Sequence, residues 1–382
     1  MKVIFLGCTT NYGFGFSANI TKIGYMAKGL VEAGADCAIH NGIIGLSGVD
    51  QDQTRSVDNL PITTFKRRGN QFLSFILNLG NLYNYLKHEH KKGESNIVVT
   101  TLSLYHILIA YYLISKMTGY KFVAISHEWG PSLKGNSKVK YWLYCLYAKT
   151  FGWYADAILP ISEYIIERIK HFKKPFFKVP ILAEFNEEEQ NNTEKNNSIV
   201  YCASVEYRRI LTMLISAYRI YADKGGNMSM TLILNGPEIM IKKMHEYIKG
   251  CGMTERILIK TQLPYKILTE EFKKAQALII PLNPNYDQDK ARFSQKIAEY
   301  LSSKSAILTN KVGEINYYFK EDEVITCNYS EEAFADAFKW IEKHKSECKR
   351  IGYNGFKRGE ADFNYKTVGK QLKDFLESLC KA

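Results

Sequence analysis

The hydrophobic residues of this 382-residue chain gather in short runs that alternate with helix-length segments. Five runs in the first half are rich in β-branched residues and predict strands: KVIFLG, DCAIH, NIVVTT, KFVAIS and ADAILP. Parallel strands need crossover connections, so this alternation is typical of a doubly wound parallel sheet with right-handed crossovers. We therefore predict an α/β domain over residues 1–185.

The same alternation restarts after a polar break. Residues 186–197, NEEEQNNTEKNN, contain no apolar residue and predict a linker. Further strands are expected in SIVYCA, SMTLILNG, RILIKT, QALIIP, SAILTN and EVITC, with helices at 207–224, 294–303 and 330–344. We predict a second Rossmann-like domain over 198–360, and a C-terminal helix over 361–382 that packs back on the first domain. Two such domains would face each other across a cleft at the carboxyl ends of their strands, where open α/β sheets bind ligands.

Composition narrows the class of protein. Apolar residues make up 46% and charged residues 24% of the chain, which are ordinary values for a globular protein. The eight cysteines stand singly, without a C-x-x-C pair or metal-ligand spacing, so we expect reduced thiols and no metal. The apolar start is too short for a signal peptide. The longest apolar stretch, residues 102–115, is shorter than the ~20 residues that span a bilayer. We expect a cytoplasmic protein.

The net charge of +12 favours anionic partners. No nucleic-acid-binding module is recognisable, so we do not expect nucleic acid among them. Residues 66–92 carry a net charge of +5 around an apolar stripe at helical spacing. The stripe comprises Phe72, Phe75, Ile76, Leu79, Leu82, Tyr83 and Leu86. It fits either a helix that docks on anionic lipid at the inner face of the cell membrane or an ordinary packing helix with solvated ends.

A glycine-containing loop follows the first predicted strand and leads to a helix that begins near Ser17. Gly13 and Gly15 would let a ligand approach the backbone closely. The glycines do not have the G-x-G-x-x-G spacing of dinucleotide-binding proteins, which argues against NAD. The loop fits a phosphate or sugar site, or a turn that merely needs glycine.

Two further segments carry candidate chemistry. His127 and Glu128 follow the strand KFVAIS, where a titratable pair would reach the cleft, although His127 also fits a structural histidine. Ser294 is a good N-cap for a helix in which Lys296 and Glu299 share one face. The positive end of that helix would hold a diphosphate in the cleft, and Glu299 can accept hydrogen bonds from a ribose diol. The alternative is an exposed Lys/Glu pair.

Several segments resemble retaining glycosyltransferases of family four, which have the GT-B fold. The sequence R-F-x-x-K-I-x-E-Y-L at 292–301, followed by T-x-x-x-G-E at 309–314, resembles the donor-binding segment of that family. The segments SIVYCASVEYRRILTMLISAYRIY, TLILNGP and ADAILPISEYIIERI also resemble family segments, in the expected order. The similarity covers most of the chain, and many members build bacterial capsule, lipopolysaccharide or exopolysaccharide.

The resemblance implies a role for each candidate residue. Glu299 would bind the nucleotide ribose, while Lys296 with Arg208 or Arg209 would stabilise the leaving diphosphate. His127 would touch the transferred sugar. The remaining donor-binding candidates are Gly13, Gly15, Gly236, Arg292 and Ser294.

The chain departs from the family pattern at two places. The first of the two family glutamates falls on Ala291, and Arg208-Arg209-Ile210 replaces a basic residue followed by glycine.

The implied reaction is retaining transfer of a sugar from a nucleotide-diphosphate donor to a glycan or lipid-linked acceptor. Cations and helix N–H groups would meet the charge of the diphosphate, so we expect no cofactor and no metal requirement. Two alternatives stay open. The absence of a carboxylate at Ala291 fits a non-catalytic GT-B scaffold or regulatory subunit, and the same architecture also occurs in nucleotide-sugar epimerases.

Overall fold

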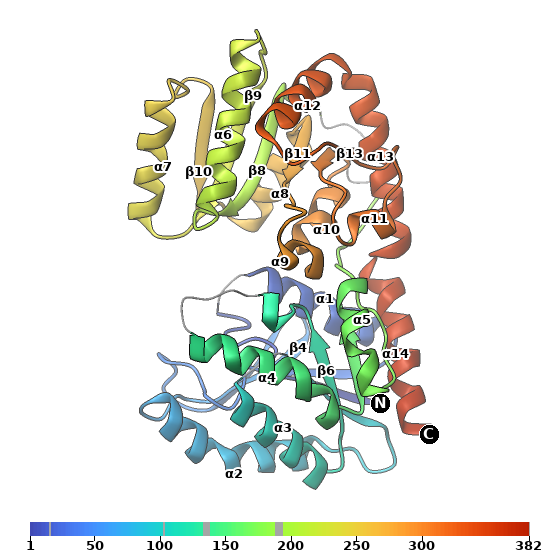
Figure 1. Cartoon of the computed structure of the whole chain (residues 1–382). Coiled ribbons are helices and arrows are strands. Elements are labelled where there is room, and N and C mark those ends of the chain that lie inside the picture. The colour runs from blue at the N-terminus through green and yellow to red at the C-terminus, as the bar shows by residue number, and fades with distance from the viewer. Residues whose placement is uncertain (15–16, 102–103, 133–137, 188–193, 382) are drawn as a thin grey trace. The chain divides into compact units, whose positions relative to one another are not determined.

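The computed structural model describes residues 1–14, 17–101, 104–132, 138–187 and 194–381, except for the side chain of Lys140. The chain divides into two compact units. Unit 1 contains Met1–Ala183, Lys290–Gln295 and Asp362–Ala382, and unit 2 contains Glu184–Asp289 and Lys296–Ala361. Figure 1 shows the elements of each unit.

Unit 1 is built on a seven-stranded sheet of order β3-β4-β2-β1-β5-β6-β7. Its strands are β1 (Lys2–Leu6), β2 (Asp36–His40), β3 (Gln53–Val57), β4 (Leu60–Thr64), β5 (Asn96–Thr100), β6 (Lys121–Ser126) and β7 (Ala157–Pro160). Its helices are α1 (Ala18–Glu32), α2 (Gln71–Glu89), α3 (Tyr105–Met117), α4 (Lys138–Tyr154), α5 (Glu163–Ile169) and α14 (Tyr365–Lys381), with short 3-10 turns at Gly130–Ser132 and Lys170–Phe172. The five strands predicted from the sequence are all present.

One face of this sheet packs against α1 and α14. Alternate residues of β1, such as Val3 and Phe5, join apolar side chains of both helices in one buried cluster. Helix α1 begins where the sequence predicts, because the Ser17 side chain accepts a hydrogen bond from the Ile20 N–H at 3.2 Å. Helix α14 follows α13 and packs along α1 within unit 1.

The β3–β4 hairpin was not predicted. The two strands are antiparallel and are joined at Asp58 and Asn59, which both have positive φ angles, of 51° and 63°. Two successive left-handed residues form the tight turn that suits the twist of a hairpin, and Asp and Asn tolerate this conformation. Strand β3 lies at the sheet edge and has the polar sequence QTRSV, so a prediction based on apolar runs does not find it.

Unit 2 contains a six-stranded sheet of order β10-β9-β8-β11-β12-β13, in which every pairing is parallel. The strands are β8 (Ser198–Ser204), β9 (Ser229–Asn235), β10 (Ile257–Thr261), β11 (Ala277–Ile280), β12 (Ala306–Thr309) and β13 (Ile325–Thr326). The helices are α6 (Arg208–Asp223), α7 (Glu238–Gly250), α8 (Tyr265–Lys274), α9 (Asp287–Ala291), α10 (Gln295–Ser302), α11 (Ile315–Tyr318), α12 (Glu331–Lys343) and α13 (Lys345–Asp362). Helices α9, α10 and α13 each have one or two terminal residues that belong to unit 1. The predicted strands and helices of this half are found.

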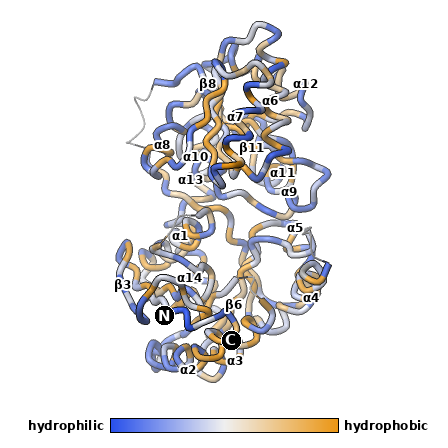
Figure 2. Tube along the Cα trace, turned by 90° about the vertical axis from the view of Figure 1, so that its left-hand side faces the viewer, coloured by the Kyte–Doolittle hydropathy of each residue, from blue (hydrophilic) through white to orange (hydrophobic). Residues whose placement is uncertain are grey.

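The core of unit 2 lies between the sheet and helices α6 and α12. Leu211, Leu214 and Tyr218 of α6 and Phe334 and Phe338 of α12 are fully buried in it. In Figure 2 hydrophobic residues gather along strands in the interior of each unit, as burial of apolar surface requires.

The sequence placed the segment around residues 290–295 in the second domain, whereas its contacts place it in unit 1. The Oγ of Ser162 donates to the carbonyl oxygen of Ala291 at 2.6 Å, and the Leu182 N–H donates to Oε1 of Gln295 at 3.2 Å. These bonds join residues more than 100 positions apart, so sequence periodicity could not reveal them. Residues 188–193, half of the predicted linker, lie outside the described residues.

Candidate active site

The carboxyl ends of the unit 1 strands surround a pocket of about 430 Å³. This is the edge at which open parallel sheets bind ligands. The lining residues follow β1, β2 and β4 or begin α2 and α3: Gly7, Thr10, Asn41, Gly42, Ile43, Ile44, Gly45, Leu46, Ser47, Arg67, Gln71, Leu104, Ile107 and Tyr111.

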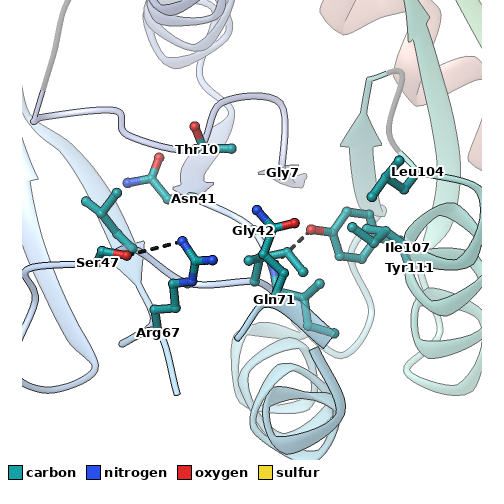
Figure 3. A pocket seen from close by; sticks show the side chains of 14 residues that line it. Gly7, Thr10, Asn41, Gly42, Ser47, Arg67, Gln71, Leu104, Ile107 and Tyr111 are labelled. Carbon is teal, nitrogen blue, oxygen red and sulfur yellow. Dashed lines mark hydrogen bonds between the residues drawn. The ribbon is translucent and has the colours of Figure 1, made fainter. Parts of the chain in front are cut away.

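This unit 1 pocket has a polar and an apolar side. Figure 3 shows Thr10, Asn41 and Arg67 on one side and Leu104 and Ile107 on the other. The Arg67 guanidinium donates to the Ser47 hydroxyl at 3.2 Å. A pocket with a few convergent polar groups and apolar walls is typical of a small-molecule site.

Glycine at position 7 is required by the wall of the unit 1 pocket. Gly7 has a φ of 62°, and a Cβ atom there would lie 2.6 Å from the Tyr111 hydroxyl oxygen. That hydroxyl accepts a hydrogen bond from the Ile43 N–H at 2.9 Å. The close approach of the β1 end to Tyr111 therefore holds the residues after β2 in place.

His127 lies at the end of β6, as predicted, and is half-buried. Its Nε2 is fully buried and has no hydrogen-bond partner among the described residues. Burial, together with the nearby positive charge of Lys22, holds the pKa of His127 well below its usual value of 6.5. The imidazole is therefore neutral at neutral pH.

Lys22 of α1 was not predicted as a site residue. Its side chain is buried and donates to the carbonyl oxygen of Val179 at 3.1 Å, and burial holds its pKa well below 10.5. The signal in the sequence was a lysine next to Ile23 on an apolar helix face. A buried lysine close to a histidine whose pKa is strongly lowered is an arrangement frequent at functional sites.

Arg292, predicted to bind the donor with the second domain, lies in unit 1 beside Glu128. Desolvation by the surrounding protein raises the pKa of Glu128 above 4.5, and the Arg292 charge opposes the shift.

Of the two candidate glycines in the first loop, Gly13 lies after β1 with a φ of 80°. Gly15 lies outside the described residues.

Glu299 and Lys296 lie on α10 in unit 2, as predicted. Glu299 is 8% exposed, and burial raises its pKa from 4.5 to about 7, while Lys296 acts to lower it. Both charges also act on the Cys202 thiol of β8, so this face of α10 lies against the carboxyl half of that strand. The Cys202 N–H donates to the Tyr300 hydroxyl at 3.1 Å and fixes the helix there. The alternative of an exposed Lys/Glu pair is wrong for Glu299.

The position at which the family glutamate is missing, Ala291, is buried. Ala291 is 1% exposed, and its carbonyl oxygen is held by Ser162. This hydrogen bond lies within unit 1 and involves the backbone of Ala291. Ser294 directly precedes the first residue of α10, Gln295, which is the position expected for an N-cap.

Arg208 and Arg209 begin α6 at the carboxyl edge of unit 2, and both are exposed. Arg209 bonds to the Tyr286 hydroxyl, and its guanidinium carbon lies 5.4 Å from the ring centre of that tyrosine. Within the described residues Arg208 makes no ion pair. A positively charged helix start at a strand end is suited to bind an anion.

Gly236 follows β9 at the same edge with a φ of 140°. A Cβ atom there would lie 2.7 Å from Cγ1 of Val205.

A second pocket, of about 490 Å³, lies at the carboxyl edge of the unit 2 sheet and is lined by Pro284, Asn310, Lys311, Val312, Thr326, Cys327, Asn328 and Tyr329. Arg209 lies close enough to Tyr329 to act on its pKa, which burial raises.

The predicted stripe of α2 is only partly correct. Phe75, Leu82 and Leu86 are buried in unit 1. Phe72 and Ile76 are 70% and 45% exposed, and they share the outer face with Leu73 and Leu77, at 47% and 50%. The helix therefore packs through one stripe and exposes a second apolar patch in its first two turns, which we call the α2 patch.

Two negative findings apply to the described parts of the chain. There, three or more His, Cys, Asp or Glu side chains never come together as a metal site would require. Likewise, no described helix is long and apolar enough to cross a membrane.

Comparison with known proteins gives one family match, which lies mainly in unit 2. Residues 183–358 match the family described as glycosyl transferases group 1. The chain carries a glycosyltransferase domain. No curated protein sequence matches it.

This match confirms the enzyme class predicted from the sequence, a glycosyltransferase. The match covers nearly all of unit 2, ending within α13, together with Lys290–Gln295 of unit 1, and it includes Lys296 and Glu299.

Solved structures resemble the whole chain of this glycosyltransferase. Sucrose-phosphate synthase from Thermosynechococcus elongatus matches with a TM-score of 0.73 at 12% identity, over 100% of this chain and 98% of that one. HepE from Anabaena in complex with UDP gives 0.69 at 11%, over 99% and 100%. A trehalose-phosphate synthase (UDP-forming) from Burkholderia xenovorans in complex with glucose-6-phosphate gives 0.69 at 11%, over 98% and 99%. The predicted GT-B fold is confirmed.

Proposed function

We propose that this protein transfers a sugar from a nucleotide-diphosphate donor held by unit 2 to an acceptor held by unit 1, with retention at the anomeric carbon. The observation that carries the proposal is the group 1 glycosyl transferase match, which contains the buried Glu299 on the same helix face as Lys296. Both residues lie in the segment that resembles the donor-binding motif of family four.

The donor would lie along the carboxyl edge of the unit 2 sheet. Glu299 would accept hydrogen bonds from the ribose hydroxyls, and those bonds would favour its ionised form. Arg208, Arg209 and Lys296 would bind the diphosphate. HepE is known in complex with UDP-glucose, so a uridine diphosphate sugar is the first donor to test.

The chemistry would depend on stabilising charge on the leaving diphosphate. Preorganised cations and helix N–H groups supply such stabilisation without reorganising during the reaction. A leaving phosphate oxygen can take the proton of the incoming hydroxyl, so a separate protein base is not needed. The neutral imidazole of His127 would contact the sugar. Since the protein cations carry this role, we propose that turnover needs no metal.

The acceptor would occupy the unit 1 pocket, whose polar side suits sugar hydroxyls and whose apolar side suits a sugar ring face or an acyl chain. Gln71 lines that pocket, and the α2 patch begins at the next residue. Exposed Lys66 lies just before this helix, beside the half-buried Arg67. An apolar patch with adjacent cations suits an anionic membrane surface. A lipid-linked acceptor in surface polysaccharide synthesis is consistent with this arrangement.

The first experiment measures release of nucleoside diphosphate from a panel of nucleotide sugars by the purified protein. We expect turnover with at least one donor and a loss of about 100-fold or more in Lys296→Ala and Glu299→Ala. Lys243 and Glu246 provide a matched control, because they have the same spacing on α7 and are both exposed. Lys243→Ala and Glu246→Ala should keep full activity.

A non-catalytic scaffold gives a different result. It would bind nucleoside diphosphate, seen as a rise in melting temperature that Glu299→Ala abolishes, but would release none from any sugar donor. Proton NMR of the product would establish the anomeric configuration, and inversion would contradict the retaining mechanism.

A further inference from the structure

A third pocket, of about 430 Å³, opens in unit 2 at the amino ends of its strands. The end of α8, the end of α10 and the first turn of α13 form it, together with residues that precede β8 and β11. Helices α8 and α10 return to this edge before β11 and β12 begin, so the pocket lies at the opposite edge of the sheet from Lys296. Its lining residues are Glu194, Lys195, Lys273, Gln276, Ser303, Lys304, Lys345, Ser346, Lys349 and Tyr353. We call it the lysine pocket.

Five of the ten lining residues are lysines, and Glu194 is the one acid among them. The Lys195 ammonium donates to the carbonyl oxygen of Lys273 at 2.7 Å and to Oγ of Ser305 at 2.6 Å. Both acceptors are neutral. Burying an ammonium without a carboxylate is unfavourable, so the surroundings of Lys195 favour an anion nearby.

Of the other lysines, Lys304 lies near the acidic side chains of Glu187 and Glu360. Lys304 donates to the carbonyl oxygen of Glu187 at 3.0 Å. Within the residues that the structure describes, Lys273, Lys345 and Lys349 form no ion pair. Burial and the charge of Lys349 lower the pKa of Lys195 from 10.5 to about 8, as expected for a partly buried cation next to a second cation.

Helix dipoles account for only some of these lysines. Lys273 and Lys304 lie at the carboxyl ends of α8 and α10, where a cation is favourable. Lys345 and Lys349 lie in the first turns of α13, where the free N–H groups already carry partial positive charge. Glu347 of the same turn pairs with Arg350, so an anion bound beside Lys345 and Lys349 would offset their repulsion from the helix amino end.

We propose that the lysine pocket binds a phosphate-bearing small molecule at a site separate from the donor. The Lys345 and Lys349 ammonium groups and the amino end of α13 contact the phosphate. The Ser346 and Tyr353 hydroxyls can accept or donate further hydrogen bonds. The pocket volume is in the range of small-molecule sites.

Isothermal titration with inorganic pyrophosphate at low salt tests the site. We expect wild-type binding to weaken about tenfold or more in Lys345→Gln/Lys349→Gln, since hydrogen bonds between charged groups are stronger than those between neutral groups. Lys366→Gln/Lys370→Gln is the matched control. Those lysines are also exposed, four residues apart and at the amino end of a helix, α14. The control should bind like wild type.

The location of binding is read independently by hydrogen exchange. Pyrophosphate should protect the first turn of α13 in wild type and not in Lys345→Gln/Lys349→Gln. Binding that is weakened only by Lys296→Gln would place pyrophosphate at the donor edge and overturn the proposal, as would unchanged affinity in the Lys345/Lys349 variant or no binding at all. Because the readout is binding, the test does not depend on whether the protein transfers sugar.

A second arm identifies the source of the phosphate. Vesicles of phosphatidylcholine with phosphatidylglycerol should not displace pyrophosphate from the pocket if its ligand is a soluble molecule. Displacement by these vesicles that is lost in Lys345→Gln/Lys349→Gln would instead assign the site to lipid headgroups and overturn the small-molecule proposal.

Discussion

Replacing Glu299 by glutamine tests the buried carboxyl on which the donor site depends. Burial raises its folded-state pKa from the ordinary 4.5 to about 7. The folded protein therefore binds more protons than the unfolded chain between these pH values, and its stability falls as pH rises through this window. Since one pKa unit corresponds to about 1.36 kcal/mol, the stability lost is about 3 kcal/mol.

The expected result is a pH-dependent difference between wild type and Glu299→Gln. The glutamine is neutral throughout, so the variant lacks this loss. The free energy of unfolding of unit 2 can be measured with urea and circular dichroism at pH values between about 4.5 and 8. In wild type it should fall by about 3 kcal/mol relative to the variant as pH rises. Parallel pH profiles for the two proteins would refute the burial argument.

Nucleotide binding gives a second readout of the same carboxyl. If the ribose hydroxyls donate to Glu299, they favour the ionised form, and binding near pH 6 releases a proton. Titration calorimetry of UDP in buffers of different ionisation enthalpy should detect that proton in wild type and not in Glu299→Gln. Equal proton release in both would mean that the ribose lies elsewhere.

Four further predictions concern other parts of the molecule. His127→Ala should lower turnover about 100-fold and leave nucleoside diphosphate binding unchanged, because the imidazole would contact the transferred sugar. Gly236→Ala should lower the free energy of unfolding by about 1–3 kcal/mol, measured with urea, because φ is 140° and the new Cβ would meet Val205. Ile76→Ser/Leu77→Ser should reduce flotation with vesicles containing phosphatidylglycerol, by loss of exposed apolar contacts. Chelation with EDTA should leave turnover unchanged.

Each of these predictions has its own control. A rise in the Kd for nucleoside diphosphate in His127→Ala would place the histidine at the nucleotide instead. Gly250→Ala tests the glycine argument, because a Cβ there meets no atom within 4 Å, and an equal loss in both variants would contradict it. Flotation that 0.5 M salt does not weaken, or that persists in the serine variant, would exclude docking through the α2 patch and its cations. Loss of turnover with EDTA that Mg²⁺ restores would show a metal requirement.

The sequence by itself determined the secondary structure and the class of fold. Short β-branched runs separated by helix-length segments predicted the strands of both units, because a parallel strand buried on both faces must be apolar along its whole length. The motif around Lys296 and Glu299 also followed from local spacing, since residues three apart share a helix face. The polar edge strand β3 was not predicted, because it is partly exposed to solvent and has no apolar run.

Tertiary structure alone decided which residues share an environment. The Ala291 carbonyl is held by Ser162, and Arg292 acts on Glu128, although each pair is more than 100 residues apart. The raised pKa of Glu299 and the cation-rich lysine pocket likewise arise from burial and from contacts between distant segments. Desolvation and charge proximity depend on distances in space, and periodicity along the chain carries no information about them.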